Sequence, residues 1–361
     1  MAHDKISLGQ LLTLLFAALL SPMIQILPRE SVLAAGRAGW MTTLAVLPAA
    51  LLLCWALHTV PGRLGEGAGL AQGLEAAFGR NVSRLLVAAY LVWGVLLLGW
   101  SARWCAYRVL SVNYRNAPLP LFILALLALT AWAGRKKLSS FARAGEIFAL
   151  ALGTALTLAL VLALFRTKWK NLGPVWAEDL PGVVRGTLPV LSLFGYGVPA
   201  AFLAGQVSRR PGAGKRLYRW AVGMCLALTV FQVICISTFG PGLIEEMETP
   251  FFMMLRVVGV PGAFERVESL IMSLWLFSDL ALLGLLFFSC RTMARHLLGG
   301  KPRPWIPVVL IAAAGGLALA SIPDLFHLSW VMERGMAAAN IIFGIAIPVF
   351  AAAAAKLRRK I

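Results

Sequence analysis

A single carboxylate, Asp279, lies in a stretch of sequence that is otherwise almost entirely apolar. This stretch is predicted to form a membrane-spanning helix over 269–290. A helical rise of about 1.5 Å per residue then places Asp279 near the middle of the bilayer. A carboxylate at that depth must be neutral, paired or hydrated. It can receive the ammonium group of a ligand, bind a proton or a cation, or act as a structural hydrogen-bonded acid.

The expected partners of Asp279 follow from the distribution of basic residues. Lys and Arg are confined almost entirely to the predicted loops. The remaining partners are helix ends, hydroxyls such as Ser273 and Ser278, water, or a bound cationic group. The ligand role and the structural role both stay open at this point.

Two predicted spans carry residues that interrupt helices. In the span over 8–28, Ser21-Pro22 lies in the middle and Gln25 lies just beyond it. Proline removes one backbone donor and clashes with the carbonyl group four residues earlier. The sequence therefore predicts a break in this first span.

The span over 187–207 carries a denser interruption, with Gly195, Gly197 and Pro199 in close succession. Unwound backbone at membrane depth is tolerated only where it is buried in protein or lines a polar cavity. Ordinary kinked helices are the alternative interpretation. Breaks at matching positions of two halves nevertheless favour the central site of a transporter.

The polar side chains nearest the two breaks are Ser21, Gln25 and Tyr196. Freed helix ends offer N–H groups to a carboxylate and C=O groups to an ammonium, so a zwitterionic amino acid fits between them. Alternatively, these side chains only satisfy broken backbone hydrogen bonds, and the aromatic residues of the third span only pack. We predict a ligand site formed by Ser21, Pro22, Gln25, Tyr90, Gly195, Tyr196, Gly197 and Asp279, with Trp93 and Trp100 beside Tyr90 as further wall candidates.

The elements that position these residues are membrane helices. Of the 361 residues, 60% are hydrophobic and only 13% are charged, whereas a soluble chain is roughly 25% charged. The apolar residues lie in blocks of about 20, enough to cross about 30 Å of hydrocarbon. This excludes a soluble enzyme, a disulfide scaffold and a disordered chain. The predicted fold is an all-α polytopic membrane protein with ten spans, at about 8–28, 39–58, 82–102, 119–134, 143–164, 187–207, 219–239, 269–290, 304–322 and 336–355.

The net charge of +18 indicates orientation rather than nucleic-acid binding. Ten spans place both termini on one side, and most of the 33 Lys and Arg residues fall on that side. Basic loops stay cytoplasmic, so both termini are predicted to be cytoplasmic. Orientation and anionic lipid explain the basic clusters, so the lipid bilayer is an expected partner and nucleic acid is not.

The sequence carries no recognisable motif for a metal, a cofactor or an enzymatic reaction. The five cysteines lack CxxC spacing, and the four histidines are scattered without an HExxH motif. No paired carboxylates and no nucleophile–base set appear at a reachable spacing. We therefore expect no metal, no cofactor and no enzymatic activity.

The ten spans divide into an inverted five-plus-five repeat within a single transmembrane domain over 1–361. The first half is predicted over about 1–165 and the second over about 187–356. An odd number of spans in each half forces the two halves into opposite orientations. Each half also carries a predicted interfacial amphipathic helix, with apolar residues at helical spacing at Leu70, Leu74 and Phe78 and at Phe251, Leu255 and Val258.

The most distinctive stretch is TPFFMMLRVVGVPGAFERVESL at 249–270, which is followed by Trp275. Leu27-Pro28 with AAGRAGW at 34–40, KIS near the N-terminus and NLGPV at 171–175 accompany it. Together these stretches resemble the endospore germination permeases, the B subunits of nutrient germinant receptors. That family is a branch of the amino acid–polyamine–organocation transporter superfamily, and the resemblance extends over essentially the whole chain.

The resemblance implies a transporter fold with broken first and sixth helices and a small nutrient ligand, typically an amino acid. It also implies two companion subunits, a larger membrane protein and a lipoprotein. For the charged residues of the motif, Arg256, Glu265, Arg266 and Glu268, it implies gating or subunit contact, whereas a solvated charge run is the ordinary interpretation. The chain departs from the family pattern at both breaks, so neither ligand identity nor ion coupling carries over.

The leading hypothesis is therefore a ligand-binding, transporter-like subunit of a spore germinant receptor in the inner membrane of a spore-forming bacterium. A secondary amino-acid transporter that works alone is the first alternative. A purely structural membrane partner with an inactive pocket is the second.

Overall fold

The computed structural model describes residues 5–62, 64–65, 67–113, 117–208, 212–258, 267–322 and 325–357. The chain is almost entirely helical. The first part contains α1 (Leu8–Ala35), α2 (Thr42–Ala45), α3 (Leu47–Gly62), α4 (Leu70–Phe78), α5 (Arg80–Asn113), α6 (Leu119–Arg135) and α7 (Leu138–Leu164). The second part contains α8 (Leu180–Gly195), α9 (Ala213–Phe239), α10 (Pro241–Glu246), α11 (Pro250–Val258), α12 (Val267–Leu297), α13 (Trp305–Ala320), α14 (Leu325–Trp330), α15 (Met336–Ile341) and α16 (Ile347–Leu357).

Shorter elements connect these helices. The 3-10 segments are η1 (Gly36–Met41), η2 (Trp169–Leu172), η3 (Ala177–Asp179) and η4 (Val198–Gln206), and the π-helical turns are η5 (Val331–Gly335) and η6 (Ile342–Ala346). Two short strands, β1 (Ile6–Ser7) and β2 (Val207–Ser208), pair in parallel with Ile6 opposite Val207.

Seven helical stretches in the described part of the chain are long and apolar enough to cross a membrane. The first, Leu8–Thr59, covers two of the predicted spans, and α6 and α13 are apolar but shorter. Helices lie at all of the predicted span positions. The prediction of an all-α polytopic membrane protein is confirmed, whereas the exact count of ten and the division into halves stay predictions.

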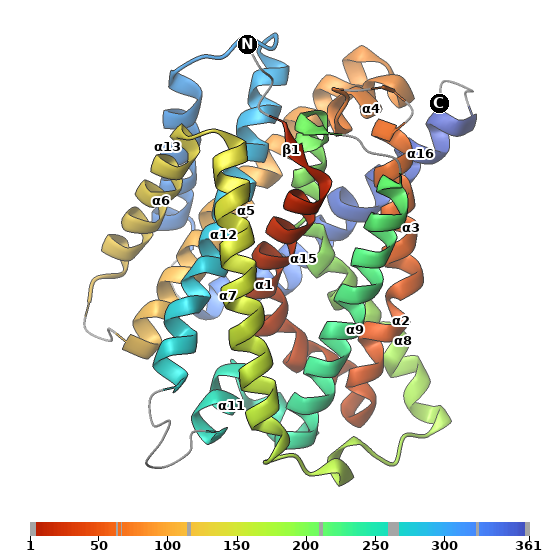
Figure 1. Cartoon of the computed structure of the whole chain (residues 1–361), viewed down its shortest axis with the longest axis vertical. Coiled ribbons are helices and arrows are strands. Elements are labelled where there is room, and N and C mark those ends of the chain that lie inside the picture. The colour runs from red at the N-terminus through yellow and green to blue at the C-terminus, as the bar shows by residue number, and fades with distance from the viewer. Residues whose placement is uncertain are drawn as a thin grey trace.

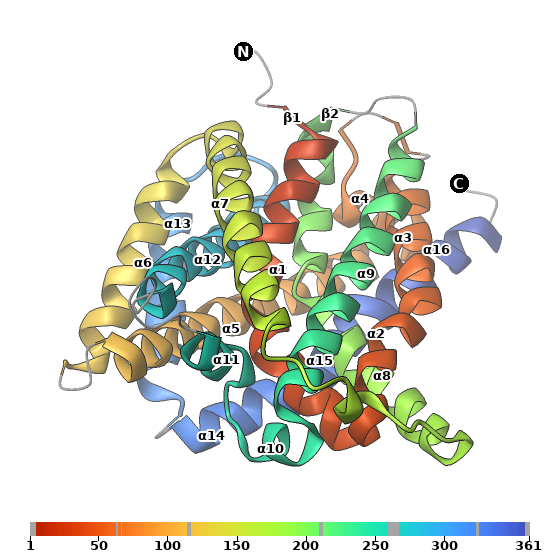
Figure 2. The ribbon, with the colours of Figure 1, turned by 60° about the horizontal axis from the view of Figure 1, so that its bottom comes forward.

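Helix α1 lies in the middle of the bundle, where α7, α8 and α12 pack around it (Figures 1 and 2). Leu14, Ala17 and Met23 are fully buried on different faces of this helix, as expected of a helix that is apolar on all sides. Its start is fixed by a capping box. The Gln10 amide N–H donates to Ser7 Oγ at 3.1 Å, and the Ser7 amide N–H donates to Gln10 Oε1 at 3.0 Å.

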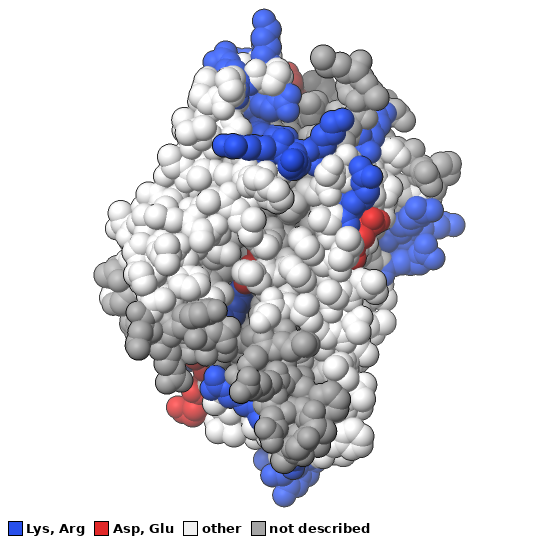
Figure 3. Space-filling view, turned by 60° about the vertical axis from the view of Figure 1, so that its left-hand side comes forward, with Lys and Arg blue, Asp and Glu red and all other residues white. Residues whose placement is uncertain are grey.

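The outer helices present apolar side chains to their surroundings. Leu121 and Leu124 on α6 and Ile147 and Leu150 on α7 are all more than half exposed. In Figure 3 the middle of the molecule shows few charged residues, while Lys and Arg gather mainly toward one end. This distribution is typical of a protein whose middle section is surrounded by lipid.

The two ends of the bundle differ in what they carry. In Figure 1, β1, α4 and the end of α16 lie toward the upper end, and α11 lies toward the lower end. The first and last described elements therefore share one end, as ten spans predict. Both amphipathic helices form where expected, with Leu70 and Leu74 of α4 and Phe251 and Leu255 of α11 buried.

The predicted break in the first span is corrected by the structure, because α1 continues as one helix through Pro22 and Pro28. Pro22 cannot donate to the carbonyl group of Ala18. Side chains of α12 bond to the same turn of α1, where Ser278 Oγ donates to the Ala17 carbonyl oxygen at 2.5 Å. Neighbouring helices commonly satisfy the backbone around a membrane proline in this way.

Candidate ligand site

A buried ion pair lies at the junction of α1, α5 and α12. Arg108 on α5 forms a salt bridge with Asp279 on α12, and the side chains are 6% and 1% exposed. Ser21 on α1 joins both partners. Its Oγ donates to Asp279 Oδ1 at 2.6 Å and accepts from Arg108 Nη1 at 3.1 Å. We call these three residues the charge cluster.

The expectation that Asp279 has no fixed basic partner is wrong. Helix α5 runs to Asn113, well beyond the predicted end of its span at 102. Arg108 therefore lies on a membrane helix and not in a loop. The available signal was the apolar pattern after residue 102, since Cys105, Ala106 and Leu110 are buried at helical spacing.

The charge cluster is electrically balanced and enclosed. The guanidinium carbon of Arg108 lies 5.9 Å from the ring centre of Phe252 on α11, a cation–π distance. A buried pair with additional hydrogen bonds tolerates the loss of hydration, whereas removal of one partner leaves an uncompensated charge. The cluster therefore stabilises the packing of α1, α5 and α12 only while both charges are present.

The predicted break in the sixth span is confirmed. Helix α8 ends at Gly195, and the chain continues as the 3-10 segment η4 from Val198. Gly195 is required by packing, because a Cβ atom there would lie 2.7 Å from Asn340 Cβ and 2.9 Å from the Asn340 carbonyl oxygen. The break therefore lies directly against α15.

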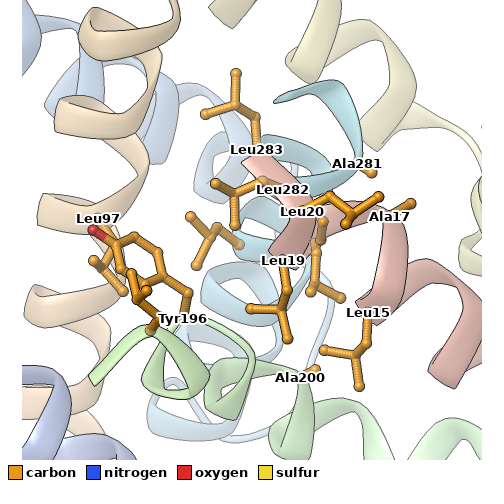
Figure 4. Packing of buried hydrophobic residues seen from close by; sticks show 14 of the residues in the cluster. Leu15, Ala17, Leu19, Leu20, Leu97, Tyr196, Ala200, Ala281, Leu282 and Leu283 are labelled. Atoms are coloured by element: carbon orange, nitrogen blue, oxygen red, sulfur yellow. The ribbon is translucent and has the colours of Figure 1, made fainter. Parts of the chain in front are cut away.

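The interior around this break is filled by apolar side chains. Figure 4 shows Tyr196 beside Leu97 of α5, with Leu19 of α1 and Leu282 of α12 further across the same apolar interior and Leu15 near Ala200. A Cβ atom on Gly197 would lie 3.1 Å from Leu15 Cδ2 and 3.4 Å from Leu19 Cδ1. In this state the space beside Gly197 is occupied by α1.

Tyr90 and Trp93 belong to a second buried group, which joins α5 to the last helical stretch. Tyr90 Oη donates to the Phe343 carbonyl oxygen at 2.6 Å, and Trp93 Nε1 donates to Asn340 Oδ1 at 3.1 Å. The rings of Trp93 and Phe343 stack with their centres 5.3 Å apart. We call Tyr90, Trp93, Tyr196, Asn340 and Phe343 the aromatic cluster.

The aromatic cluster contains two polar atoms whose hydrogen bonding is incomplete. Tyr196 Oη and Asn340 Nδ2 are buried and lack a standard hydrogen-bond partner among the described residues, although the two side chains lie close enough to interact with each other. Phe343 also lies in a π-helical turn, an irregularity that occurs frequently at functional sites. Sequence patterns singled out Tyr90 and Tyr196 but missed Asn340, which looks like an isolated amide in an alanine-rich helix.

Three further residues of the predicted site, Pro22, Gln25 and Trp100, belong to neither cluster. Pro22 and Gln25 are buried on α1, beside and one turn beyond Ser21. Trp100 lies apart from the aromatic cluster's hydrogen bonds, because its Nε1 donates to Ser321 Oγ at 2.8 Å.

The predicted gating residues are described only in part. Arg256 is exposed in the last turn of α11. Glu265, Arg266 and the side chain of Glu268 lie outside the described residues. Their suggested gating or contact role stays a prediction.

Other cavities of comparable size lie among the described residues. Apolar side chains line one of about 300 Å³ between α6, α7 and α12 and one of about 380 Å³ between α1, α7 and α9. Another, of about 420 Å³, has polar walls and lies beside β1, α4 and the end of α12. Among the described residues, no three His, Cys, Asp or Glu side chains lie together in an arrangement that could hold a metal ion.

The sequence and the fold were compared with those of known proteins. A family model described as "Spore germination protein" matches residues 5–322. A sequence comparison with curated proteins finds no match.

Solved structures of a membrane transporter share the fold. A mutant manganese transporter of Eremococcus coleocola superposes with a TM-score of 0.55 at 14% identity, covering 96% of this chain and 78% of that one. The same transporter in complex with an aromatic bis-isothiourea compound gives 0.55 at 15% identity, covering 94% and 78%. At this identity the likeness establishes a transporter fold and nothing further.

Proposed function

The chain belongs to the spore germination protein family, and on that premise we propose that it is the ligand-sensing, transporter-like subunit of a spore germinant receptor. Its family and fold are those of membrane transporters and not of enzymes. The proposed ligand is a small zwitterionic nutrient such as an amino acid. The observation that supports this most strongly is the balanced charge cluster at the junction of α1, α5 and α12.

A zwitterion suits this place because it carries both charges that the cluster contains. Its carboxylate complements the Arg108 guanidinium, and its ammonium complements the Asp279 carboxylate. In the structure the two side chains neutralise each other. A bound amino acid can separate them without leaving either charge unpaired.

The proposed further contact is Tyr196, at the break in the sixth span. Its Oη is a buried donor that lacks a standard hydrogen-bond partner, and an incoming ligand can accept from it. Leu15 and Leu19 pack beside Gly197, so ligand entry requires α1 to move relative to η4. Binding then favours the arrangement in which α1 has moved, and differential affinity shifts the equilibrium.

No metal site is proposed here, although the structural neighbours are manganese transporters. The guanidinium of Arg108 already lies against the carboxylate of Asp279. It repels a second cation at that position. An organic zwitterion meets no such repulsion.

We propose that the protein lies in the inner membrane of the spore with both termini cytoplasmic. Its proposed companions are a larger membrane subunit and a lipoprotein. Arg256, Glu265, Arg266 and Glu268 are proposed to gate the outer side or to contact those companions. Labelling from outside should reach a Glu246→Cys variant and not a Lys356→Cys variant, each built in a chain with its native cysteines replaced. The opposite pattern would reverse the orientation.

The test of the proposed function uses the purified chain in neutral detergent and a panel of common amino acids. At least one amino acid should raise the melting temperature in a saturable way. Reconstituted into proteoliposomes without companions, the chain should bind that amino acid but should not accumulate it. Saturable flux under these conditions would instead establish the alternative, a transporter that works alone, which the fold also allows.

A further inference from the structure

A cavity with polar walls lies at the end of the molecule that carries β1 and the end of α16. Its volume is about 420 Å³, and the side chains that line it come from four separate elements. Those side chains are Lys5, Gln72, Gln206, Thr292, Arg295 and His296. We call it the polar cavity. It is remote in the fold from the charge cluster, which lies at the junction of α1, α5 and α12.

The lining of the polar cavity consists of hydrogen-bond donors and positive charge. Lys5 and Arg295 carry full positive charges, and none of the described lining residues is acidic. The Gln72 side-chain oxygen already accepts from the Gly69 amide N–H at 2.9 Å, which leaves its amide group as a donor. Gln206 Nε2 donates one N–H to Thr292 Oγ1 at 3.4 Å, and the Thr292 hydroxyl donates to the Phe288 carbonyl oxygen at 2.9 Å. The two cationic side chains and the remaining amide N–H groups match an oxyanion.

The backbone around the polar cavity is held in place by local bonds. The pairing of β1 with β2 brings Lys5 next to the end of the sixth span. The Gly300 amide N–H donates to the Arg295 carbonyl oxygen at 2.7 Å, and Gly300 has a positive φ of 80°. This glycine cap closes α12 and fixes the backbone from which Arg295 projects.

We propose that the polar cavity binds a phosphate-class oxyanion, either free inorganic phosphate or the headgroup of an anionic phospholipid. On the orientation proposed above, this end of the molecule is cytoplasmic, where basic pockets between membrane helices suit such headgroups. The anion would join the residue that precedes β1, the helix α4, the end of η4 and the C-terminal end of α12. Occupancy therefore stabilises the contacts between these four segments.

The direct test measures the melting temperature of the purified full chain in neutral detergent. Inorganic phosphate is titrated against chloride at constant ionic strength. Phosphate should raise the melting temperature along a saturable curve. The midpoint of that curve should rise about tenfold or more in Arg295→Gln and in Lys5→Gln, the loss expected for one charged hydrogen bond.

The matched control is Arg303→Gln, which removes an exposed arginine that follows α12 and does not line the cavity. It should keep the wild-type midpoint. A second arm compares nanodiscs of phosphatidylglycerol with nanodiscs of phosphatidylcholine. Stabilisation by phosphatidylglycerol that Arg295→Gln abolishes identifies a lipid headgroup as the source, whereas stabilisation by phosphate alone identifies the free ion.

Two results would overturn the proposal. In one, phosphate does not stabilise the wild-type chain more than chloride does, and phosphatidylglycerol does not stabilise it more than phosphatidylcholine does. In the other, both variants and the control respond as the wild type does, which would mean that general surface charge explains the effect.

Discussion

The first and sixth spans both carry a proline in their interior, yet only the sixth changes its helix type. In α1, Pro22 lies within a continuous helix, and side chains from α12 bond to the same turn. In the sixth span, α8 ends at Gly195 and the chain continues as a 3-10 segment. One missing donor can be compensated by neighbours, whereas closely spaced glycines remove the preference for the helix itself.

The two spans also differ in what holds them in place. Around Pro22 the contacts are charged and polar, with Ser21, Arg108 and Asp279 bonded together. Around Gly195 they are close backbone contacts with Asn340 and aromatic packing. The first span is therefore expected to be sensitive to charge, and the sixth to side-chain volume.

The largest effect should come from breaking the charge cluster on one side only. Arg108→Leu leaves the Asp279 carboxylate buried without its cation, and we expect a loss of about 3–5 kcal/mol of unfolding free energy. Unfolding in a denaturant series in mixed micelles measures it. The exposed Arg143→Leu is the control and should change stability by about 0.5 kcal/mol or less. If Arg108→Leu lowers the unfolding free energy no more than the control does, the cluster does not stabilise the packing of the three helices.

The next effect concerns volume at the sixth-span break. Gly195→Ala places a methyl group 2.7 Å from Asn340 Cβ, so α8 and α15 must separate. We expect a destabilisation of about 1–3 kcal/mol, the usual cost of overpacking. The control is Gly153→Ala on α7, where a Cβ atom meets nothing within 4 Å, and it should stabilise by up to about 1 kcal/mol. If the two alanine variants change the melting temperature equally, the close contact between Gly195 and Asn340 does not limit side-chain volume at position 195.

The smallest effect is expected at Pro22. Because α1 is already helical there and is held by α12, Pro22→Ala should change the unfolding free energy by about 1 kcal/mol or less. Helical content by circular dichroism should stay constant. A marked gain in helical content would indicate that the proline does unwind α1 in solution, contrary to the structure.

Much of the fold was accessible from the sequence because apolar blocks and membrane thickness determine helix positions. The amphipathic helices and the Gly195–Gly197 break also followed from spacing alone. The end of α5 did not, since Arg103 and Arg108 look like loop residues until their tertiary partners are known. Arg103 in fact donates to the Ala318 carbonyl oxygen at 2.8 Å, inside the bundle.

The candidate site was predicted less completely than the fold, because it depends on tertiary contacts that sequence patterns do not reveal. Ser21, Tyr196 and Asp279 were identified from their depth and chemistry. Arg108 and Asn340, which contact them or complete their clusters, lie far away in sequence and in no recognisable motif. The pairing Arg108–Asp279 joins residues on different helices, and helix periodicity carries no information about such contacts.

The proposed zwitterionic ligand separates the Arg108–Asp279 pair and binds both of its charges. Asp279→Asn alone is a poor test, because it leaves the Arg108 charge buried and destabilises the protein. The double variant Arg108→Gln with Asp279→Asn removes both charges and keeps hydrogen-bonding groups, so near wild-type stability is expected.

The decisive measurement is the affinity of this double variant for the amino acid that most stabilises the wild-type chain, with the melting temperature recorded on the same sample. Isothermal titration should show affinity reduced by about 1.5–3 kcal/mol or more, roughly tenfold to over a hundredfold, at a nearly unchanged melting temperature. A stably folded double variant that binds the amino acid with wild-type affinity would contradict the account.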